Sequence, residues 1–299
     1  MAEQVTFRVS DDLDGERLDK VLADHFAIAR SSARDLVGQG VLVDGAKASP
    51  SDRLDKGQEV QSPRPETTDG LVPEPVTFAV LLEDDQVIVV DKPAGLVVHP
   101  GAGNRKGTLA AGLVHRYPEL GNVGPPQRAG LVHRLDKDTS GTLLVARTPA
   151  SYQSLVGALR RRQIERVYLA LVEGSMPAAT GTIDAPIGGD PARPTRRAVV
   201  HGGKPARTHY QVLEEVAGER FTLLEVTLET GRTHQIRVHL AAISHPVVGD
   251  RVYGTGRSEA PRTFLHAARL GFQHPGTGDR ITVASPLPED LARALDRMR

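Results

Sequence analysis

The sequence predicts an α+β fold made of two domains joined by a linker. Segments with the apolar pattern of strands outnumber those with a helical pattern, and the two kinds do not alternate regularly along the chain. The 30 glycines and 21 prolines among 299 residues are typical of a chain rich in strands and loops. A Pro-rich, weakly apolar stretch at 64–75 predicts a linker between domains at 1–63 and 76–299.

The N-terminal domain is expected to contain two short helices and a small hairpin. Apolar residues recur at helical spacing over 18–26, and glycine ends a second helical segment. This domain carries eight basic and twelve acidic side chains, so it is acidic overall. The expected elements are a strand at 5–9, helices at 18–26 and 33–38, and a strand with a turn at 40–45.

The larger domain shows more strand patterns than helical ones. Thr233 is expected to cap a helix whose apolar stripe is formed by Ile236, Leu240 and Ile243. Strands are expected within 76–98 and at 167–174, 208–213, 221–228 and 262–267, and helices at 108–115, 151–159, 234–242 and 286–299.

Composition narrows the classes of protein to which the chain can belong. Without cysteine there is no disulfide framework, no thiol nucleophile and no thiolate metal site. The N-terminus lacks the apolar core of a signal peptide, and the longest aliphatic runs are far too short to cross a bilayer. The 37 basic residues balance the 37 acidic ones, which argues against a generic nucleic-acid coat protein. We expect a cytoplasmic, monomeric protein that does not associate with a membrane.

Positive charge gathers locally in two places. Four arginines close the expected helix at 151–159, where they form either a solvated cap or a phosphate grip, and we favour the grip. The stretch 191–213 has no acidic residue and is interpreted as a mobile basic hairpin that clamps RNA, with a solvated loop as the alternative. The residues concerned are Arg160, Arg161, Arg162 and Arg166 in the first place, and Arg193, Arg196, Arg197, Lys204 and Arg207 in the second.

The signature segment, residues His133–Gly141, is the best candidate for a functional site. It reads HRLDKDTSG and lies between two short apolar stretches, 130–132 and 142–146, that each have the pattern of a buried strand. Charged side chains are rarely buried unless they are paired or functional. On pattern alone, a polar hairpin loop in which Gly141 supplies the turn is an equally good interpretation.

The signature segment resembles that of the RluA-type pseudouridine synthases, which isomerise uridine in RNA. Two further blocks carry the same resemblance, DDQVIVVDKPAGLVVHP at 84–100 and TGRTHQIRVHL at 230–240, which continues to HPVVGD at 245–250. Together these blocks cover roughly residues 76 to 290, while the start of the chain resembles an S4 RNA-binding domain. The resemblance implies a small S4-like α/β domain followed by a mixed, mostly antiparallel β-sheet that is flanked by helices and loops.

The resemblance also assigns roles to residues of this chain. It implies that Asp136 is the essential catalytic carboxylate and that Arg237 is its ion-pair partner. It implies that Tyr168 stacks on the flipped-out base and that Arg134 moves into or beside the vacated space. Asp138 is the rival nucleophile. RNA contacts are implied for Lys92 in the larger domain and for Arg30 and Arg34 in the S4-like domain, although the acidity of that domain leaves loss of RNA binding open.

Isomerisation of uridine needs neither a redox step nor an energy input, so we expect no cofactor and no metal. The histidines at 234, 239 and 245 lack the spacing and the carboxylate of a zinc site. Asp136 could attack the sugar, add to the uracil ring or remove a sugar proton, and the sequence leaves all three steps open.

RNA is the expected partner, and the combination of domains favours large-subunit ribosomal RNA, with transfer RNA as the other target. Two other classes of function were weighed. A non-catalytic RNA-binding or ribosome-assembly factor on the same fold would use the pocket only as a base clamp. A glycoside hydrolase would need a second carboxylate block, and the sequence shows none of comparable quality.

Overall fold

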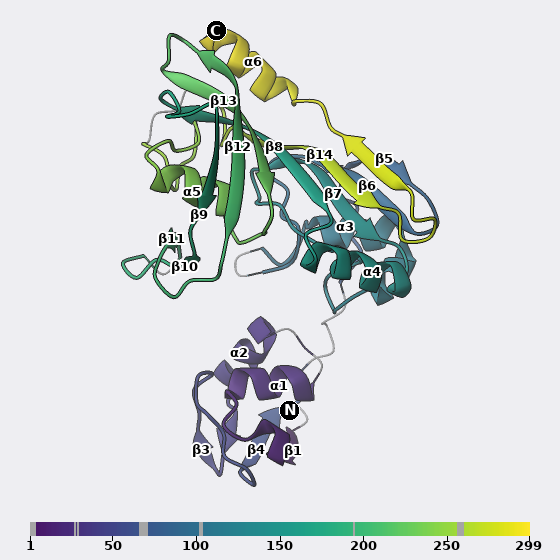
Figure 1. Cartoon of the computed structure of the whole chain (residues 1–299). Helices are drawn as coiled ribbons and strands as arrows, with labels where there is room; N and C mark the ends of the chain where they lie inside the picture. Colours follow the sequence, from purple (N-terminus) through teal and green to yellow (C-terminus); the bar gives the residue numbers. More distant parts are fainter. Residues whose placement is uncertain are drawn as a thin grey trace.

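The computed structural model describes residues 4–26, 28, 30–65, 71–101, 104–193, 195–255 and 260–299. Residues 4–63 form a four-stranded antiparallel sheet in the order β1-β4-β2-β3, with two helices beside it (Figure 1). They have a hydrophobic core of their own, in which Leu18, Leu22 and Val60 have no exposed surface. The elements are β1 (Gln4–Arg8), α1 (Leu18–His25), α2 (Arg30–Gly38), β2 (Leu42–Val43), β3 (Ala46–Lys47) and β4 (Glu59–Pro63).

The rest of the described chain is built on a nine-stranded mixed sheet. Its order is β5-β6-β7-β14-β8-β13-β12-β9, with β15 paired to β14. The pair β7–β14 is parallel, and the other pairs are antiparallel. The strands are β5 (Ala79–Glu83), β6 (Val87–Lys92), β7 (Ser140–Ala146), β8 (Glu165–Glu173), β9 (Thr180–Asp184), β12 (Arg207–Val216), β13 (Phe221–Leu228), β14 (Leu265–Gln273) and β15 (Arg280–Ala284). A separate hairpin consists of β10 (Ile187–Gly189) and β11 (Arg197–Val199).

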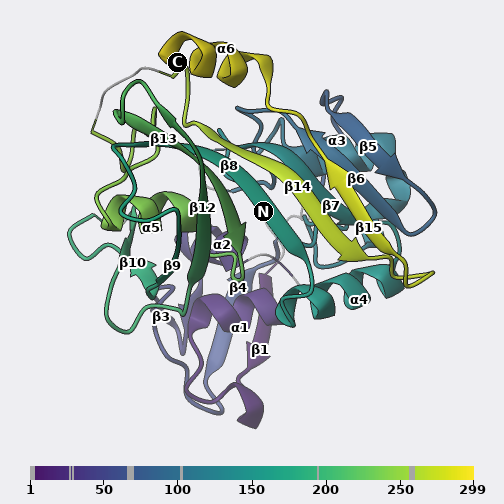
Figure 2. The ribbon, with the colours of Figure 1, turned by 45° about the horizontal axis from the view of Figure 1, so that its top comes forward.

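Four helices flank the large sheet among the described residues: α3 (Leu109–Arg116), α4 (Pro149–Arg160), α5 (Gln235–Ala242) and α6 (Glu289–Met298). Figures 1 and 2 show α3 and α4 beside the β6–β7 part of the sheet, and α5 beside β12 and the β10–β11 hairpin. Local signals fix where two of them begin. The Thr108 side chain accepts the Ala111 N–H at the start of α3, and Thr148 and Ser151 form a reciprocal capping box at the start of α4. No helix in the described part of the chain is long and apolar enough to cross a membrane.

The predicted α+β class and the mostly antiparallel mixed sheet are confirmed, whereas several element boundaries were wrong. The predicted Thr233 cap is absent, because His234 is the residue before α5 and no side chain caps that helix. Helix α2 begins at Arg30, earlier than predicted. The late strand begins later than predicted and runs over 265–273. The strands β4, β9, β10, β11 and β15 were not predicted. The predicted linker at 64–75 includes residues 66–70, which lie outside the described residues.

Gly141 lies inside β7, so the alternative interpretation in which it supplies the turn of a polar hairpin loop is wrong. It pairs with Lys92 of β6 on one side and with Ala267 of β14 on the other, so it belongs to the central and only parallel junction that the described sheet contains. Its φ is +114°, and an added Cβ would lie 2.2 Å from the Ala267 carbonyl oxygen. Glycine is required here because no other residue tolerates both the backbone conformation and this close approach.

We expect Gly141→Ala to lower the free energy of unfolding by roughly 2–4 kcal/mol, because it combines backbone strain with a clash at the middle of the sheet. Urea unfolding followed by circular dichroism measures this change. Gly278→Ala is the matched control, since Gly278 also has a positive φ of +79° but has open space around its Cβ position. Equal losses in the two variants would show that the contact with β14 contributes nothing.

Candidate active site

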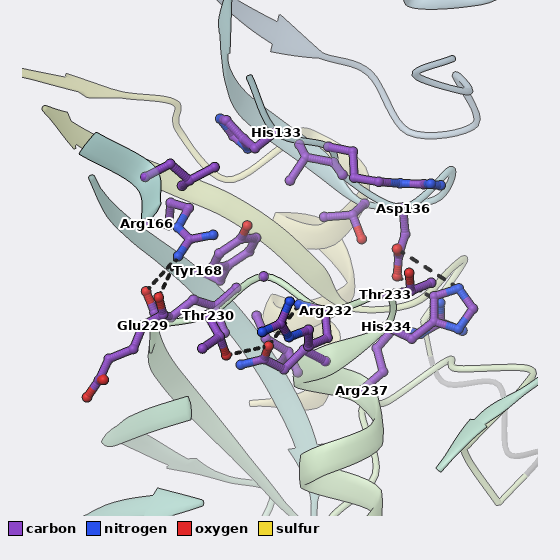
Figure 3. Close-up of a pocket in the computed structure, with 18 of the residues that line it drawn as sticks. His133, Asp136, Arg166, Tyr168, Glu229, Thr230, Arg232, Thr233, His234 and Arg237 are labelled. Carbon is purple, nitrogen blue, oxygen red and sulfur yellow. Dashed lines mark hydrogen bonds and ion pairs between the residues drawn. The ribbon is translucent and has the colours of Figure 1, made fainter. Parts of the chain in front are cut away.

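A cavity of about 470 Å³ lies between the signature segment and the first turn of α5 (Figure 3). Strand β8, the end of α4 and the turn at 229–234 complete its walls. These elements are far apart in the sequence and meet because β7, β14, β8 and β13 are consecutive neighbours in the sheet. The predicted catalytic residue and all three predicted supporting residues line the cavity: Asp136, Arg134, Tyr168 and Arg237.

Arg237 joins two carboxylates through all three of its nitrogen atoms. Its Nη1 donates to Asp136 Oδ2 at 2.9 Å, while Nε and Nη2 donate to the two oxygens of Asp250 at 2.6 and 2.9 Å. The Arg237 side chain is 10% exposed, and that of Asp250 is fully buried. The planar, bidentate pairing with Asp250 fixes the plane of the guanidinium and so determines where Nη1 meets Asp136.

Asp250 is in turn fixed by the backbone. Its Oδ1 accepts the N–H groups of Val252 and Tyr253 at 2.8 and 3.1 Å. Burial acts to raise the pKa of Asp250, but the hydrogen bonds and charge of Arg237 outweigh it, so this pKa lies below its usual range. For Arg237 burial acts to lower the pKa, and the two carboxylates raise it above the ordinary value. Asp250 thus provides the buried Arg237 cation with an anionic partner inside the protein.

Lys92, the last residue of β6, fixes the backbone of the signature segment through hydrogen bonds. The Nζ atom donates to three carbonyl oxygens, those of Pro93, Leu96 and Lys137, at 2.8–2.9 Å. Lys92 has no exposed surface, so the prediction that it faces RNA was wrong. Burial lowers the pKa of Lys92 to about 7, and the charges of Asp138 and Asp136 oppose this shift. Three carbonyl acceptors require three N–H donors, which only the ammonium form provides.

Arg262 holds the other end of the signature segment. It donates to the Asp138 carbonyl oxygen at 3.1 Å and to Ser140 Oγ at 3.0 Å. Both oxygens of Asp290, in the first turn of α6, accept hydrogen bonds from the same guanidinium. The position of this segment thus depends on the C-terminal helix, more than a hundred residues further along the chain.

His133 anchors the start of the signature segment to β7. Its Nε2 accepts the Leu144 N–H at 3.1 Å, so the ring proton is on Nδ1. Burial, assisted by the charge of Arg166, lowers the pKa of His133 to about 3, which keeps the ring neutral. Its role is therefore to hold the backbone in place and not to transfer protons.

Tyr168 and Arg166 lie on the same face of β8, two residues apart, and both line the cavity. Tyr168 is 5% exposed, and burial raises the pKa of its hydroxyl to about 12. Arg166 is equally buried and donates through Nη2 to the carbonyl oxygens of Leu228 and Glu229, both at 3.1 Å. It thereby ties the end of β13 to β8 and fixes the turn that precedes α5 (Figure 3).

The sequence did not identify two further residues of the site, His234 beside Asp136 and Asp250 beside Arg237. His234 lines the cavity, and its backbone has a left-handed conformation with φ 58°. Its Nε2 is 4.0 Å from Asp136 Oδ1. Its Nδ1 is 2.8 Å from the Tyr253 hydroxyl. Asp250, the other missed partner of the site, had a usable signal: it follows the apolar pair Val247–Val248, and a carboxylate beside a buried segment needs a cation.

The predicted RNA-binding arginines occupy different environments. Arg160 and Arg162 line the cavity, and Arg162 pairs with Glu229. Arg161 donates to Gln163 instead. The β10–β11 hairpin and the residues that follow it carry Arg193, Arg196, Arg197 and Lys204. Arg207 pairs with Asp184 and Glu229.

Arg30 and Arg34 belong to α2, beside α1, and are distant in sequence from the residues that line the cavity. Both donate to the fully buried carboxylate of Asp19, together with Arg17. Hydrogen bonds from Arg17 make the largest contribution to lowering the pKa of Asp19, and those from Arg30 and Arg34 add to it. The two side chains remain 48% and 56% exposed, so one carboxylate orients them at the surface.

The arrangement around Asp136 suits acid–base or nucleophilic chemistry on a neutral, planar substrate. The carboxylate is about one-fifth exposed and faces a cavity, its orientation is set by an arginine, and an aromatic ring forms part of the opposite wall. The cavity volume is sufficient for a nucleoside. Among the described residues no group of three His, Asp or Glu side chains is arranged to hold a metal ion.

Comparison with known proteins identifies the family. A family model described as RNA pseudouridylate synthase matches residues 86–242. The chain is 44% identical to "Ribosomal large subunit pseudouridine synthase D" of Nitrosomonas europaea, over 99% of this chain and 88% of that protein. It is 41% identical to the Escherichia coli protein of the same name, over 99% and 94% of the two chains.

A solved structure gives the same result. Human RNA Pseudouridylate Synthase Domain Containing 1 is similar with a TM-score of 0.60 and 28% identity, over 74% of this chain and 89% of that one. The residues 86–242 that match the family model include Asp136, Tyr168 and Arg237. The chain therefore belongs to the RNA pseudouridylate synthase family and is a pseudouridine synthase.

Proposed function

We propose that this enzyme converts specific uridines of large-subunit ribosomal RNA to pseudouridine, with Asp136 as the catalytic carboxylate. The observation that carries the assignment of Asp136 is its position at the cavity, paired with an arginine that a second, buried carboxylate holds. The choice of RNA is supported by the names of relatives that match nearly the whole chain.

The reaction breaks the bond between N1 and the sugar, turns the uracil and joins C5 to the same sugar carbon. C5 loses a proton and N1 gains one, so no atom enters or leaves overall. A carboxylate can assist by attacking the sugar, by adding to the ring or by removing a sugar proton. Arg237 serves each of these routes, because it holds Asp136 Oδ2 in a fixed direction and leaves Oδ1 directed toward the cavity.

The target base must leave its stack to reach Asp136, which costs roughly a few kcal/mol. We propose that Tyr168 stacks on the extruded uracil and that Arg134 occupies the space beside it. Tyr168 is suited to this because its ring forms part of the cavity wall and its high pKa keeps the hydroxyl neutral. Arg134 is suited because it is exposed at the mouth of the same cavity.

We propose that RNA is gripped on both sides of the cavity, by Arg160, Arg161 and Arg162 at the end of α4 and by the basic residues around the β10–β11 hairpin. We further propose that residues 1–63 act as an S4-like RNA-binding domain, joined by the linker 64–75 to a catalytic domain at 76–299. Its separate core and the two arginines oriented by Asp19 support this role. An acidic domain can bind RNA in this way because affinity depends on the charges that meet phosphate.

Asp136→Asn is expected to abolish turnover while RNA binding persists, because the amide keeps the size of the side chain but can neither attack nor accept a proton. Tritium release from RNA labelled at uracil C5 measures turnover, and filter binding measures affinity. Asp138→Asn is the control, since this exposed neighbour is fixed through its backbone carbonyl only. A fully active Asp136→Asn together with an inactive Asp138→Asn would exchange the two roles.

The identity of the RNA is tested in cells with and without the gene. Carbodiimide-dependent primer-extension stops map pseudouridine in total ribosomal RNA. We expect discrete stops in the large-subunit RNA to disappear on deletion and to return with the wild type but not with Asp136→Asn. Unchanged ribosomal stops would overturn the proposed target and direct the same mapping to transfer RNA.

Asp250→Asn is expected to lower the single-turnover rate at saturating RNA by roughly ten- to a hundredfold, because Arg237 loses its buried anionic partner and no longer presents Nη1 in a fixed direction. It should also lower the free energy of unfolding by roughly 3 kcal/mol. Asp296→Asn, which removes an exposed carboxylate paired with Arg299, is the control. A wild-type rate in Asp250→Asn would show that Arg237 does not need this support.

A further inference from the structure

Tyr253 connects three parts of the site that are otherwise separate. Its backbone N–H donates to Asp250, and its ring lies 5.1 Å from the Arg237 guanidinium carbon. Its hydroxyl is 2.8 Å from His234 Nδ1 and accepts the backbone N–H of Arg197 at 3.0 Å. Arg197 is the first residue of β11, so the hydroxyl joins the hairpin to a residue that faces Asp136.

The direction of these hydrogen bonds follows from their donors. The Arg197 N–H can only donate, so the Tyr253 oxygen accepts there and its own hydrogen is available for His234 Nδ1. The proton of a neutral His234 is then on Nε2, which is the nitrogen that faces Asp136 Oδ1. Burial lowers the pKa of His234, although the charge of Asp136 opposes this, and the ring is therefore neutral near pH 7.

The hairpin is also packed against the helix that carries Arg237. Ile187 at the start of β10, Ala206 and Val238 of α5 form a small hydrophobic cluster, and Tyr253 packs on it. Side-chain packing and the Arg197 N–H therefore both connect the hairpin to Tyr253. The backbone of His234 lies in the left-handed region, where a non-glycine residue is held by its surroundings.

We propose that Tyr253 is a positioning residue that transmits the seating of the β10–β11 hairpin on RNA to His234 and thereby completes the alignment of Asp136. The 4.0 Å from His234 Nε2 to Asp136 Oδ1 is too long for a hydrogen bond, and a shift of about 1 Å would make one. Both carboxylate oxygens would then be fixed, one by Arg237 and one by His234. This inference rests on the proposed function, in which the hairpin binds RNA and Asp136 is catalytic.

The first test is Tyr253→Phe, which keeps the ring against Arg237 and removes only the hydroxyl. We expect the single-turnover rate at saturating RNA to fall roughly tenfold, as for the loss of one hydrogen bond at a reacting group, with the dissociation constant for RNA unchanged. Tyr152→Phe on α4 is the matched control, a tyrosine outside the cavity lining. A wild-type rate in Tyr253→Phe, or a loss confined to RNA affinity, would overturn the proposal.

The second test addresses the connection to the hairpin. Arg197→Pro lacks the N–H that Tyr253 accepts, whereas Arg197→Ala loses the same side chain and keeps that N–H. We expect Arg197→Pro to reduce the saturating rate relative to Arg197→Ala, and the double variant Arg197→Pro/Tyr253→Phe to be no slower than Tyr253→Phe alone. Equal rates for the two Arg197 variants, or additive losses in the double variant, would contradict the coupling.

These outcomes are separable from failure of the proposed function. If Asp136 is not the catalytic carboxylate, Asp136→Asn keeps its rate whatever Tyr253→Phe does. If the large-subunit RNA is not the substrate, the wild type itself releases no tritium from it, and the Tyr253 and Arg197 variants are then compared on the RNA that the wild type does modify.

Discussion

The ion pair between Arg237 and two carboxylates is the interaction on which the site depends. A buried guanidinium is costly unless it is fully paired, and Asp250 provides that pairing through two hydrogen bonds with its own backbone support. Because Asp250 already balances the positive charge of Arg237, the third nitrogen of the guanidinium can serve to orient Asp136. The order of strands β7, β14, β8 and β13 is what brings the two ends of this pair together across a hundred residues of sequence.

A second constraint acts on the backbone of the signature segment. This loop contains charged side chains, yet it is held mainly through its carbonyl oxygens. Lys92 holds the carbonyl of Lys137 and Arg262 holds that of Asp138, so two cations from distant segments fix the two residues that follow Asp136. The side chains of Lys137 and Asp138 are exposed, whereas that of Asp136 is held by Arg237 at the cavity.

The sequence was informative where function requires particular residue types, and less so where geometry decides. Asp136, Arg237 and Tyr168 could be named because the segments around them resemble those of a known family, and the structure brings all three to one cavity. Lys92 was misassigned because a sequence does not reveal that a lysine has three carbonyl partners. The Thr233 cap was predicted from local propensity, but His234 precedes the helix instead. The alternative of a hairpin turn at Gly141 likewise rested on local propensity, and the close contact with β14 could not be inferred from the sequence. The sequence drew attention to His234 only as a metal candidate, because neither its left-handed backbone nor its contact with Tyr253, nineteen positions away, is visible there.

The contact between Arg262 and Asp290 has a consequence for how the protein is made. The chain leaves the ribosome from its N-terminus, so the signature segment emerges long before residues 262 and 290 are synthesised. Until they arrive, the Asp138 carbonyl and Ser140 lack the donor that fixes them in the finished fold. The nascent chain thus carries every side chain of the Asp136–Arg237–Asp250 group before it contains Asp290, and α6 then adds the contact to Arg262 that fixes the end of the loop.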